Sequence, residues 1–497
     1  MLPRRAGVLV HPTSLPGPFG VGDMGRDTVR FLDWAAEAGF GVWQVLPLGP
    51  PGPEHSPYSS PSAFAGNTEL ISPQRLLDEG GLTAIDPGPL GPSLRDRIDF
   101  RRLLPWKRRL LRRSWHEFRG RASPTDLEAY RAFAGDADQA DWLEDWVMFA
   151  VLRGRFGGRP WTQWDRQFRD REGDALNEAR ESLADELDYE RYLQFLFCRQ
   201  WNAVRDAAHQ RGINILGDVP IYPAHDSADL WAHRELFQLD ADGAPLKVAG
   251  VPPDYFSETG QLWGNPLYRW DRMAEDGFAW WVSRLRTNFR RTDRVRLDHF
   301  RGFEAYWEVD AAEHSAVGGR WVPGPGEALF VAFRDALGER QFVAEDLGEI
   351  TQPVRDLRDA LGLPGMRVLQ FAFGDDPGEH HPDQHPRNAV VYTGTHDNDT
   401  SRGWFEAHDQ PGKRRILDEL QADESTVVWR LIELAYASPA DTIIIPLQDL
   451  LELGSEARMN VPGVRDGNWC WRVRGDRLTR ELAAQLRELA DAHGRLG

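Results

Sequence analysis

Short apolar runs rich in β-branched residues alternate along the chain with longer segments whose apolar residues recur every three or four positions. The first pattern predicts buried strands and the second predicts amphipathic helices. Their alternation is typical of βα units around a parallel sheet. The apolar runs are residues 7–10, 42–48, 214–221, 294–300, 342–346, 367–373, 389–395 and 442–447. Eight strands with intervening helices predict an α/β fold, the (β/α)8 TIM barrel.

Two stretches interrupt the alternation. The interval between the second and third predicted strands is much longer than a βα crossover and carries charged helical patterns, so we expect a mainly helical insertion at 49–200. Residues 248–270 are rich in Gly, Pro and aromatic residues, and long loops of this kind are often functional. We therefore expect an aromatic active-site loop there. The simplest layout is a single catalytic barrel over 1–497 with these two excursions.

Composition excludes several classes of protein. The chain has 497 residues, 41% hydrophobic and 27% charged, which is typical of a soluble globular protein. Its formal net charge of −18 disfavours nucleic acid as a partner. No apolar run approaches the roughly 18 residues of a membrane span, so no membrane partner is expected. Cys198 and Cys470 are the only cysteines, and we expect both to be reduced in a cytoplasmic protein.

Acidic residues stand at the carboxyl ends of four predicted strands, where barrel enzymes carry their active sites. They are Asp218, Asp298, Glu345 and Asp397. Arg296 lies two residues before Asp298, so both side chains share one face of the strand. A cation there keeps a carboxylate ionised, as a nucleophile requires. Glu345, on the next strand, is the candidate for the protonated second carboxyl group of a retaining glycosidase-type reaction.

A divalent metal site is the competing interpretation, because His299 and His396 accompany these carboxylates. Arg296 argues against it, since its guanidinium would occupy the place of the metal. The 20 tryptophans slightly favour a carbohydrate ligand, because indole rings stack on sugar faces.

The sequence around these residues resembles that of a known family. In order, Asp218, Arg296 with Asp298, Glu345, and His396 with Asp397 resemble the four short sequence regions of the α-amylase superfamily. Longer segments resemble its amylomaltase (4-α-glucanotransferase) family, glycoside hydrolase family 77, over about residues 5–471. The segments that carry this resemblance are residues 11–18, 43–50, 56–58, 252–257, 296–303, 393–400 and 456–460.

The resemblance implies disproportionation of α-1,4-glucans by a retaining double displacement, with a glucan donor and a glucose or maltooligosaccharide acceptor. Asp298 is then the nucleophile, Glu345 the general acid and base, and Asp397 the carboxylate that grips sugar hydroxyls. The resemblance assigns no metal and no cofactor. The substrate contacts that it implies or allows are Tyr58, Asp218, Tyr255, Phe256, Trp263, Arg296, His299, His396 and Asn460.

Two rival functions use the same barrel. A hydrolase of the same superfamily has the same carboxylates and passes the glycosyl group to water. A glycan-binding protein on an inactive barrel would lack one of the three catalytic acids, and all three are present. The chain also departs from the family text at Pro53-Glu54-His55, where a Tyr-Gly-Asp is usual. This departure affects an expected glucan contact, and the catalytic acids are unaffected.

Overall fold

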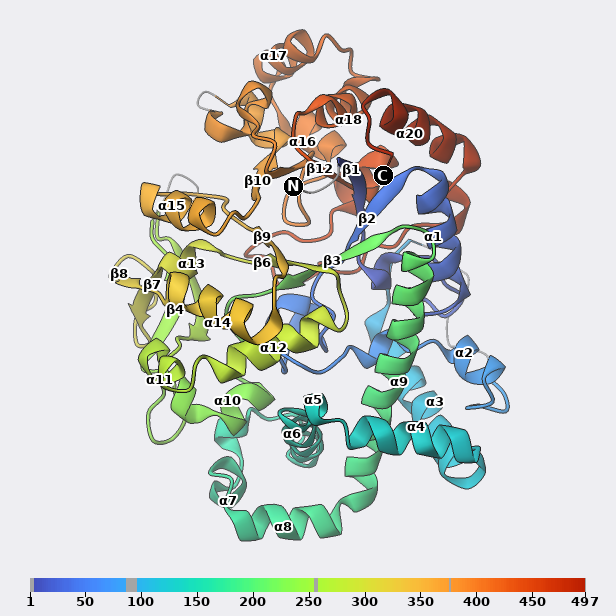
Figure 1. Ribbon diagram of the computed structural model, residues 1–497, viewed down its shortest axis with the longest axis vertical. Coiled ribbons are helices and arrows are strands. Elements are labelled where there is room, and N and C mark those ends of the chain that lie inside the picture. The colour runs from blue at the N-terminus through green and yellow to red at the C-terminus, as the bar shows by residue number, and fades with distance from the viewer. Residues whose placement is uncertain (1–3, 86–95, 254–257, 375–376, 497) are drawn as a thin grey trace.

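Eight parallel strands close into a barrel in the computed structural model of the chain (Figure 1). The structure describes residues 4–85, 96–253, 258–374 and 377–496. The order around the barrel is β1-β12-β11-β10-β9-β6-β3-β2, and the predicted (β/α)8 fold is confirmed. The barrel strands are β1 (Arg5–Leu9), β2 (Phe40–Gln44), β3 (Asn214–Val219), β6 (Arg294–Leu297), β9 (Gln341–Ala344), β10 (Gly365–Val368), β11 (Ala389–Tyr392) and β12 (Thr442–Pro446).

The barrel strands are continuous apolar runs because helices cover them outside and side chains fill them inside. Every residue of β11 and β12 is buried. An inner core fills the barrel, and the half-buried Tyr58 and Leu347 pack against it. Among its members are Val42, Leu216, Val343, Met366, Val390, Tyr392 and Ile444.

The sixth predicted strand, 367–373, is only partly a strand. The ladder runs over Gly365–Val368, and Leu369–Phe373 form a 3-10 turn. The prediction was wrong for 369–373 because most of this turn is buried, and a short buried apolar run has the same pattern in a strand and in a helix.

A second, antiparallel sheet of order β5-β4-β7-β8 lies beside the barrel. Its strands are β4 (Lys247–Val251), β5 (Gln261–Pro266), β7 (Ala305–Asp310) and β8 (Arg320–Pro323). Residues 248–270, predicted as a loop, contain β4 except its first residue and all of β5, so that prediction was wrong for these strands. Four of the six residues of β5 are exposed, and an exposed strand lacks the apolar alternation by which strands are recognised.

Helices occupy the range predicted as an insertion. The described part of 49–200 contains α2 (Pro73–Asp78), α3 (Phe100–Arg121), α4 (Pro124–Ala134), α5 (Ala137–Ala140), α6 (Leu143–Arg155), α7 (Arg166–Arg169), α8 (Gly173–Ser182) and most of α9 (Ala184–His209). The long helix α9 contacts β3 and α1 at the barrel and α3, α4, α6 and α8 in the inserted region. Figure 1 shows it extending from the barrel to the edge of the molecule where α8 lies.

Along the chain, the remaining helices come after strands of the barrel or of the small sheet. They are α1 (Arg26–Glu37), α10 (Ala228–Ala232), α11 (Trp270–Glu275), α12 (Ala279–Phe289), α13 (Arg301–Glu304), α14 (Glu327–Leu337), α15 (Gln352–Ala360), α16 (Ser401–Ala407), α17 (Gln410–Leu420), α18 (Val427–Ala437), α19 (Leu447–Leu450) and α20 (Arg480–Ala492). Helix α20 packs on α1, so the two ends of the chain meet (Figure 1). Among the residues described, none of these helices combines the length and the apolar character needed to span a membrane.

Candidate active site

The carboxyl ends of neighbouring strands bring the predicted acids to one rim of the barrel. Asp218 lies in β3 and pairs in register with Arg296 of β6. Asp298 follows β6 directly, and Glu345 follows β9, which is the next strand around the barrel. The positions agree with the sequence prediction, because the carboxyl ends of parallel barrel strands meet at the same edge.

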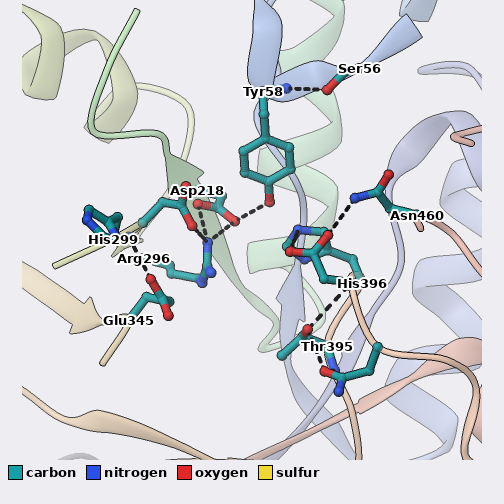
Figure 2. Close-up of polar contacts among 12 residues, drawn as sticks. Ser56, Tyr58, Asp218, Arg296, His299, Glu345, Thr395, His396 and Asn460 are labelled. Carbon is teal, nitrogen blue, oxygen red and sulfur yellow. Dashed lines mark hydrogen bonds and ion pairs between the residues drawn. The ribbon is translucent and has the colours of Figure 1, made fainter. Parts of the chain in front are cut away.

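Arg296 connects two of these carboxylates. Its Nη1 donates to both oxygens of Asp218, at 2.9 and 2.8 Å (Figure 2). The same Nη1 lies 2.8 Å from Oδ1 of Asp298. Burial alone lowers the pKa of Arg296, but Asp218 and Asp298 outweigh it and hold the pKa well above its ordinary value. The expected contact between Arg296 and Asp298 is confirmed, and Asp218 is a second partner of the same guanidinium.

Asp298 is the more accessible of the two partners. Its side chain is 28% exposed, whereas that of Asp218 is completely buried. Burial raises the pKa of the Asp298 carboxyl, Arg296 acts against this rise, and Asp218 adds to it. An adjacent cation favours the charged form of a carboxyl group. The ionised form of Asp298 therefore depends on Arg296.

Glu345 has different surroundings. Its Oε2 accepts a hydrogen bond from the backbone N–H of His299 at 2.7 Å, and its Oε1 accepts one from that of Leu347 at 3.0 Å. Burial raises the pKa of Glu345 to about 7, with Asp298 adding to the rise and Arg296 opposing it. A carboxyl group with a pKa near 7 holds its proton for much of the time at neutral pH, which suits a general acid.

Asp397 is held from the other side of the site. Asn460 Nδ2 donates to its Oδ1 at 2.6 Å, and His396 Nε2 lies 3.4 Å from its Oδ2. Thr395 Oγ1 accepts from the Asp397 N–H at 3.3 Å. These contacts hold the Asp397 carboxylate in place. Its side chain is nevertheless 47% exposed, so it is accessible to a ligand.

Tyr58 lies between Asp218 and His396 and contacts both. Its hydroxyl donates to Oδ2 of Asp218 at 2.8 Å, and its ring stacks on His396 with centroids 5.0 Å apart and an interplanar angle of 9°. Figure 2 shows the ring between Asp218 on one side and His396 with Asn460 on the other. Burial raises the pKa of Tyr58 well above its ordinary value, so the phenol remains a donor.

His299 and Trp263 meet at the rim. His299, whose backbone N–H donates to Glu345, has a left-handed backbone conformation with φ of 53°. Burial lowers the pKa of His299 to about 3, so its imidazole is neutral. The ring of Trp263, on β5, meets the His299 ring edge-on with centroids 4.7 Å apart. The small sheet therefore brings an exposed indole to His299, the residue that donates its N–H to Glu345. Tyr255 and Phe256, predicted as further contacts, lie outside the described residues.

Comparison with known proteins agrees with this geometry. The glycoside hydrolase family 77 model, described as 4-alpha-glucanotransferase, matches residues 10–479. The chain is 49% identical to the 4-alpha-glucanotransferase of Thermus thermophilus, with 100% of both chains covered. It is 46% identical to the chloroplastic/amyloplastic 4-alpha-glucanotransferase of Solanum tuberosum, over 99% of this chain and 87% of that one. The chain belongs to the 4-α-glucanotransferase family.

A solved structure extends this agreement to the fold. The structure titled "Amylomaltase from Streptococcus agalactiae in complex with acarbose" superposes with a TM-score of 0.93 at 34% identity, over 99% of each chain. The resemblance to the 4-α-glucanotransferases and the expected transferase activity are confirmed.

Two residues at the site of this 4-α-glucanotransferase were absent from the sequence prediction. Arg458 Nη2 donates to the Asp397 carbonyl at 2.7 Å, and its Nε donates to that of Asn460 at 2.8 Å. Arg458 lies two residues before Asn460, within the segment 456–460 that carries the family resemblance, so the sequence could have indicated it. Trp469 packs against Tyr58 and His396, with centroids 5.8 and 6.1 Å apart, and no local pattern indicates this contact.

Pro53-Glu54-His55, which stand where the family text usually has Tyr-Gly-Asp, form a short 3-10 turn. Glu54 and His55 both have left-handed backbones, with φ of 64° and 63°. The His55 ring stacks on Phe100 with centroids 3.6 Å apart, and Glu54 Oε1 lies 2.7 Å from Arg465 Nε. The segment before Tyr58 is thus fastened to both α3 and the segment that precedes Trp469.

Within the ranges that the structure describes, no group of three or more His, Cys, Asp or Glu side chains is arranged to hold a metal ion. In the active site the guanidinium of Arg296 lies between the carboxylates of Asp218 and Asp298.

Proposed function

We propose that this 4-α-glucanotransferase cleaves an α-1,4-glucan donor by attack of Asp298 and transfers the bound glycosyl group to an acceptor sugar. The observation that carries the proposal is the contrast between the two reacting carboxyl groups. Asp298 contacts the Arg296 guanidinium at 2.8 Å, whereas burial raises the pKa of Glu345 to about 7 against the lowering effect of Arg296 and of two backbone N–H donors. Burial raises the pKa of both groups, but the adjacent Arg296 favours the ionised form of Asp298, whereas Glu345 holds its proton for much of the time at neutral pH.

In the first step, Glu345 gives its proton to the glycosidic oxygen while a carboxylate oxygen of Asp298 bonds to the anomeric carbon. The bond from that carbon to the leaving sugar breaks, and the shortened glucan departs with a free 4-hydroxyl. Glu345 is now ionised, and its two N–H donors stabilise the charge. The donor's glycosyl group is left as an ester on Asp298.

In the second step, the 4-hydroxyl of an acceptor glucose or maltooligosaccharide gives its proton to Glu345 and attacks the anomeric carbon. The ester bond to Asp298 breaks, and the configuration of the donor linkage is restored because two displacements have occurred. Glu345 regains the proton that it gave away, so the site returns to its initial state.

The remaining site residues are assigned to binding the sugar at the reacting position. We assign the exposed carboxylate of Asp397, fixed by Asn460 and His396, to sugar hydroxyl groups. Tyr58 offers a ring face beside Asp218, and the exposed Trp263 offers an indole for stacking. We infer that Trp263 also helps to exclude water from the glycosyl ester.

We further infer that the protein works in the cytoplasm. The support is chemical, because Cys198 and Cys470 both carry free thiols, as proteins of reducing compartments do.

Trapping of the intermediate tests the assignment of Asp298. The Glu345→Gln variant is incubated with 5-fluoro-α-glucosyl fluoride, whose leaving group needs no proton, and is then digested and analysed by mass spectrometry. The proposal predicts one added fluoroglucosyl group on the peptide that contains Asp298. A label on Asp397 or Asp218 instead would refute the assignment.

A further inference from the structure

A cavity with a volume of about 430 Å³ lies outside the barrel, where α4, α5, α9 and α12 meet. Small-molecule sites usually occupy roughly 300–1,000 Å³. The two cavities that border the catalytic residues, one beside His396 and one beside Tyr58 and Asp218, are only about 20 and 40 Å³. The proposed reaction makes no use of the larger cavity.

One side of this cavity is aromatic. Phe133 of α4 and Phe195, Phe197 and Trp201 of α9 line it. The three rings from α9 are buried, and Phe197 stacks parallel to Trp201 with an interplanar angle of 4°. Phe133 is only partly buried, so its ring has surface with which to pack on a flat apolar body, and the buried rings of α9 keep this side of the cavity apolar.

The other side carries a buried cation, Arg291, which is 7% exposed. Its guanidinium donates to the carbonyl oxygens of Phe64 and Ala65. No carboxylate pairs with it in the part of the chain that the structure describes. Burial lowers the pKa of Arg291, as expected of a cation without a counter-ion. An anion inside the cavity would supply the missing charge.

The other charged groups at the cavity are already neutralised. Arg290 Nη2 lies 2.7 Å from Asp136, the carboxylate that also lines the cavity, and Arg290 Nη1 lies 2.9 Å from Asp138. Arg199 pairs with Glu79 at 3.1 Å and with Asp126 at 3.3 Å. The uncompensated charge at the cavity therefore belongs to Arg291.

Cys198 also lines the cavity, and its thiol does not supply the counter-charge. Burial raises the pKa of the Cys198 thiol, and Arg291 acts against the rise without cancelling it. The thiol is therefore neutral at physiological pH, and it provides a chemical reporter inside the cavity.

We propose that this cavity is a second binding site, for a small aromatic carboxylate or phosphate. The acidic group binds the Arg291 guanidinium, and the aromatic body packs against Phe133, Phe195 and Trp201. An arginine fork matches the geometry of both acidic groups. An acidic group and an aromatic body distinguish this ligand from a neutral glucan, and Arg291 also borders the cavity beside Tyr58 and Asp218.

Protection of Cys198 from alkylation tests the site in the unmodified enzyme. The protein is treated with N-ethylmaleimide, and labelling of each cysteine is followed by peptide mass spectrometry. We expect phenyl phosphate to slow labelling of Cys198 about tenfold near saturation. Cys470, which is not among the lining residues, is the internal control and should react at an unchanged rate. Benzyl alcohol and inorganic phosphate, which each lack one half of the ligand, should protect weakly.

Calorimetric titration with phenyl phosphate gives a second readout that does not need the thiol to react. Saturable binding near one equivalent is expected. No saturable binding, or protection by benzyl alcohol equal to that by phenyl phosphate, would overturn the proposal.

Variants identify the anion-binding group. Arg291→Gln should weaken phenyl phosphate about tenfold, whereas Arg291→Lys, which keeps the charge and loses the fork, should weaken it less. Arg495→Gln is the matched control, because Arg495 is also a buried arginine that donates to backbone carbonyls, and it lies outside the cavity. Should Arg291→Gln fail to fold, Phe133→Ala removes apolar contact and should weaken phenyl phosphate. Wild-type affinity in Arg291→Gln or in Phe133→Ala contradicts the proposal.

Discussion

Arg296 influences both reacting carboxyl groups in the same direction. It lowers the pKa of Asp298, which it contacts at 2.8 Å, and it also lowers the pKa of Glu345. The proposed reaction needs Asp298 ionised and Glu345 protonated. The working pH range is therefore bounded below by Asp298 and above by Glu345, whose pKa is about 7.

Replacing Arg296 by Gln should move both limits. Without the cation the pKa of each carboxyl group rises, so the acidic and alkaline limbs of kcat/KM against pH should both shift upward, by about one unit or more. The measurement is the pH profile for disproportionation of maltotriose. Arg320→Gln is the control, because Arg320 pairs with Glu308 on the small sheet. A profile that stays in place after loss of Arg296 contradicts the electrostatic role.

Glu345→Gln removes the acid and leaves the nucleophile. Transfer from maltotriose should fall about 10²- to 10⁴-fold, the range for loss of a general acid or base. With a glycosyl fluoride donor, which needs no protonation, the first step should recover most of its rate. The check is the burst of fluoride in the first turnover against the rate of glucose release from maltotriose, because later turnovers also need Glu345 as the base of the second step. An equal loss with both donors argues against Glu345 as the acid.

The acids and several of their supports, among them Arg296, His396 and Asn460, could be predicted from the sequence, whereas Trp469 could not. Asp218, Asp298, Glu345 and Asp397 follow apolar runs, so the barrel pattern alone places them at one rim. Trp469 reaches Tyr58 only because the chain returns to the rim after β12, which is a tertiary contact that no local period encodes.

At the scale of elements, the small sheet supplies the aromatic side chain beside the active site. Trp263 is carried by β5 and is 37% exposed, while its ring edge meets His299. The buried barrel strands were recognisable from their apolar runs, but β5 was missed because it buries little of its own surface. Its position depends on pairing with β4, which the sequence pattern does not specify.

Trp263→Ala should raise the share of donor that ends in water. Loss of the indole opens the glycosyl ester to solvent, so we expect the hydrolysis-to-transfer ratio to rise several-fold, within the roughly tenfold that 1.4 kcal/mol represents. The matched control is Trp321→Ala on β8, since Trp321 is also 37% exposed and stacks on Arg301 away from the acids. The ratio comes from reducing ends released per glucosyl transferred. A ratio unchanged by Trp263→Ala counts against the shielding role.

At the scale of the whole molecule, the barrel closes where the first and last strands pair. Each residue of β1 pairs with one of β12, and β1 also pairs with β2. A Cβ on Gly7 would lie 2.8 Å from the Val42 side chain and 3.2 Å from that of Ile444. Closure therefore requires a residue without a side chain at this position.

Gly7→Ala should destabilise the protein by about 1–3 kcal/mol, the usual effect of overpacking a core. Gly154→Ala is the control, because Gly154 lies in α6 with open space around its Cβ position. There, alanine should be neutral or stabilising by up to about 1 kcal/mol. Urea denaturation followed by tryptophan fluorescence measures both. Equal stability of the two variants disagrees with a tightly packed closure.

The central claim is that the whole barrel serves glycosyl transfer to a sugar. The direct test is incubation of the purified enzyme with maltotriose, with products separated by chain length while reducing ends are titrated. The account predicts glucose together with a ladder of longer maltooligosaccharides, and a constant number of reducing ends. A steady rise in reducing ends that finishes in glucose and maltose would contradict it and make the protein a hydrolase.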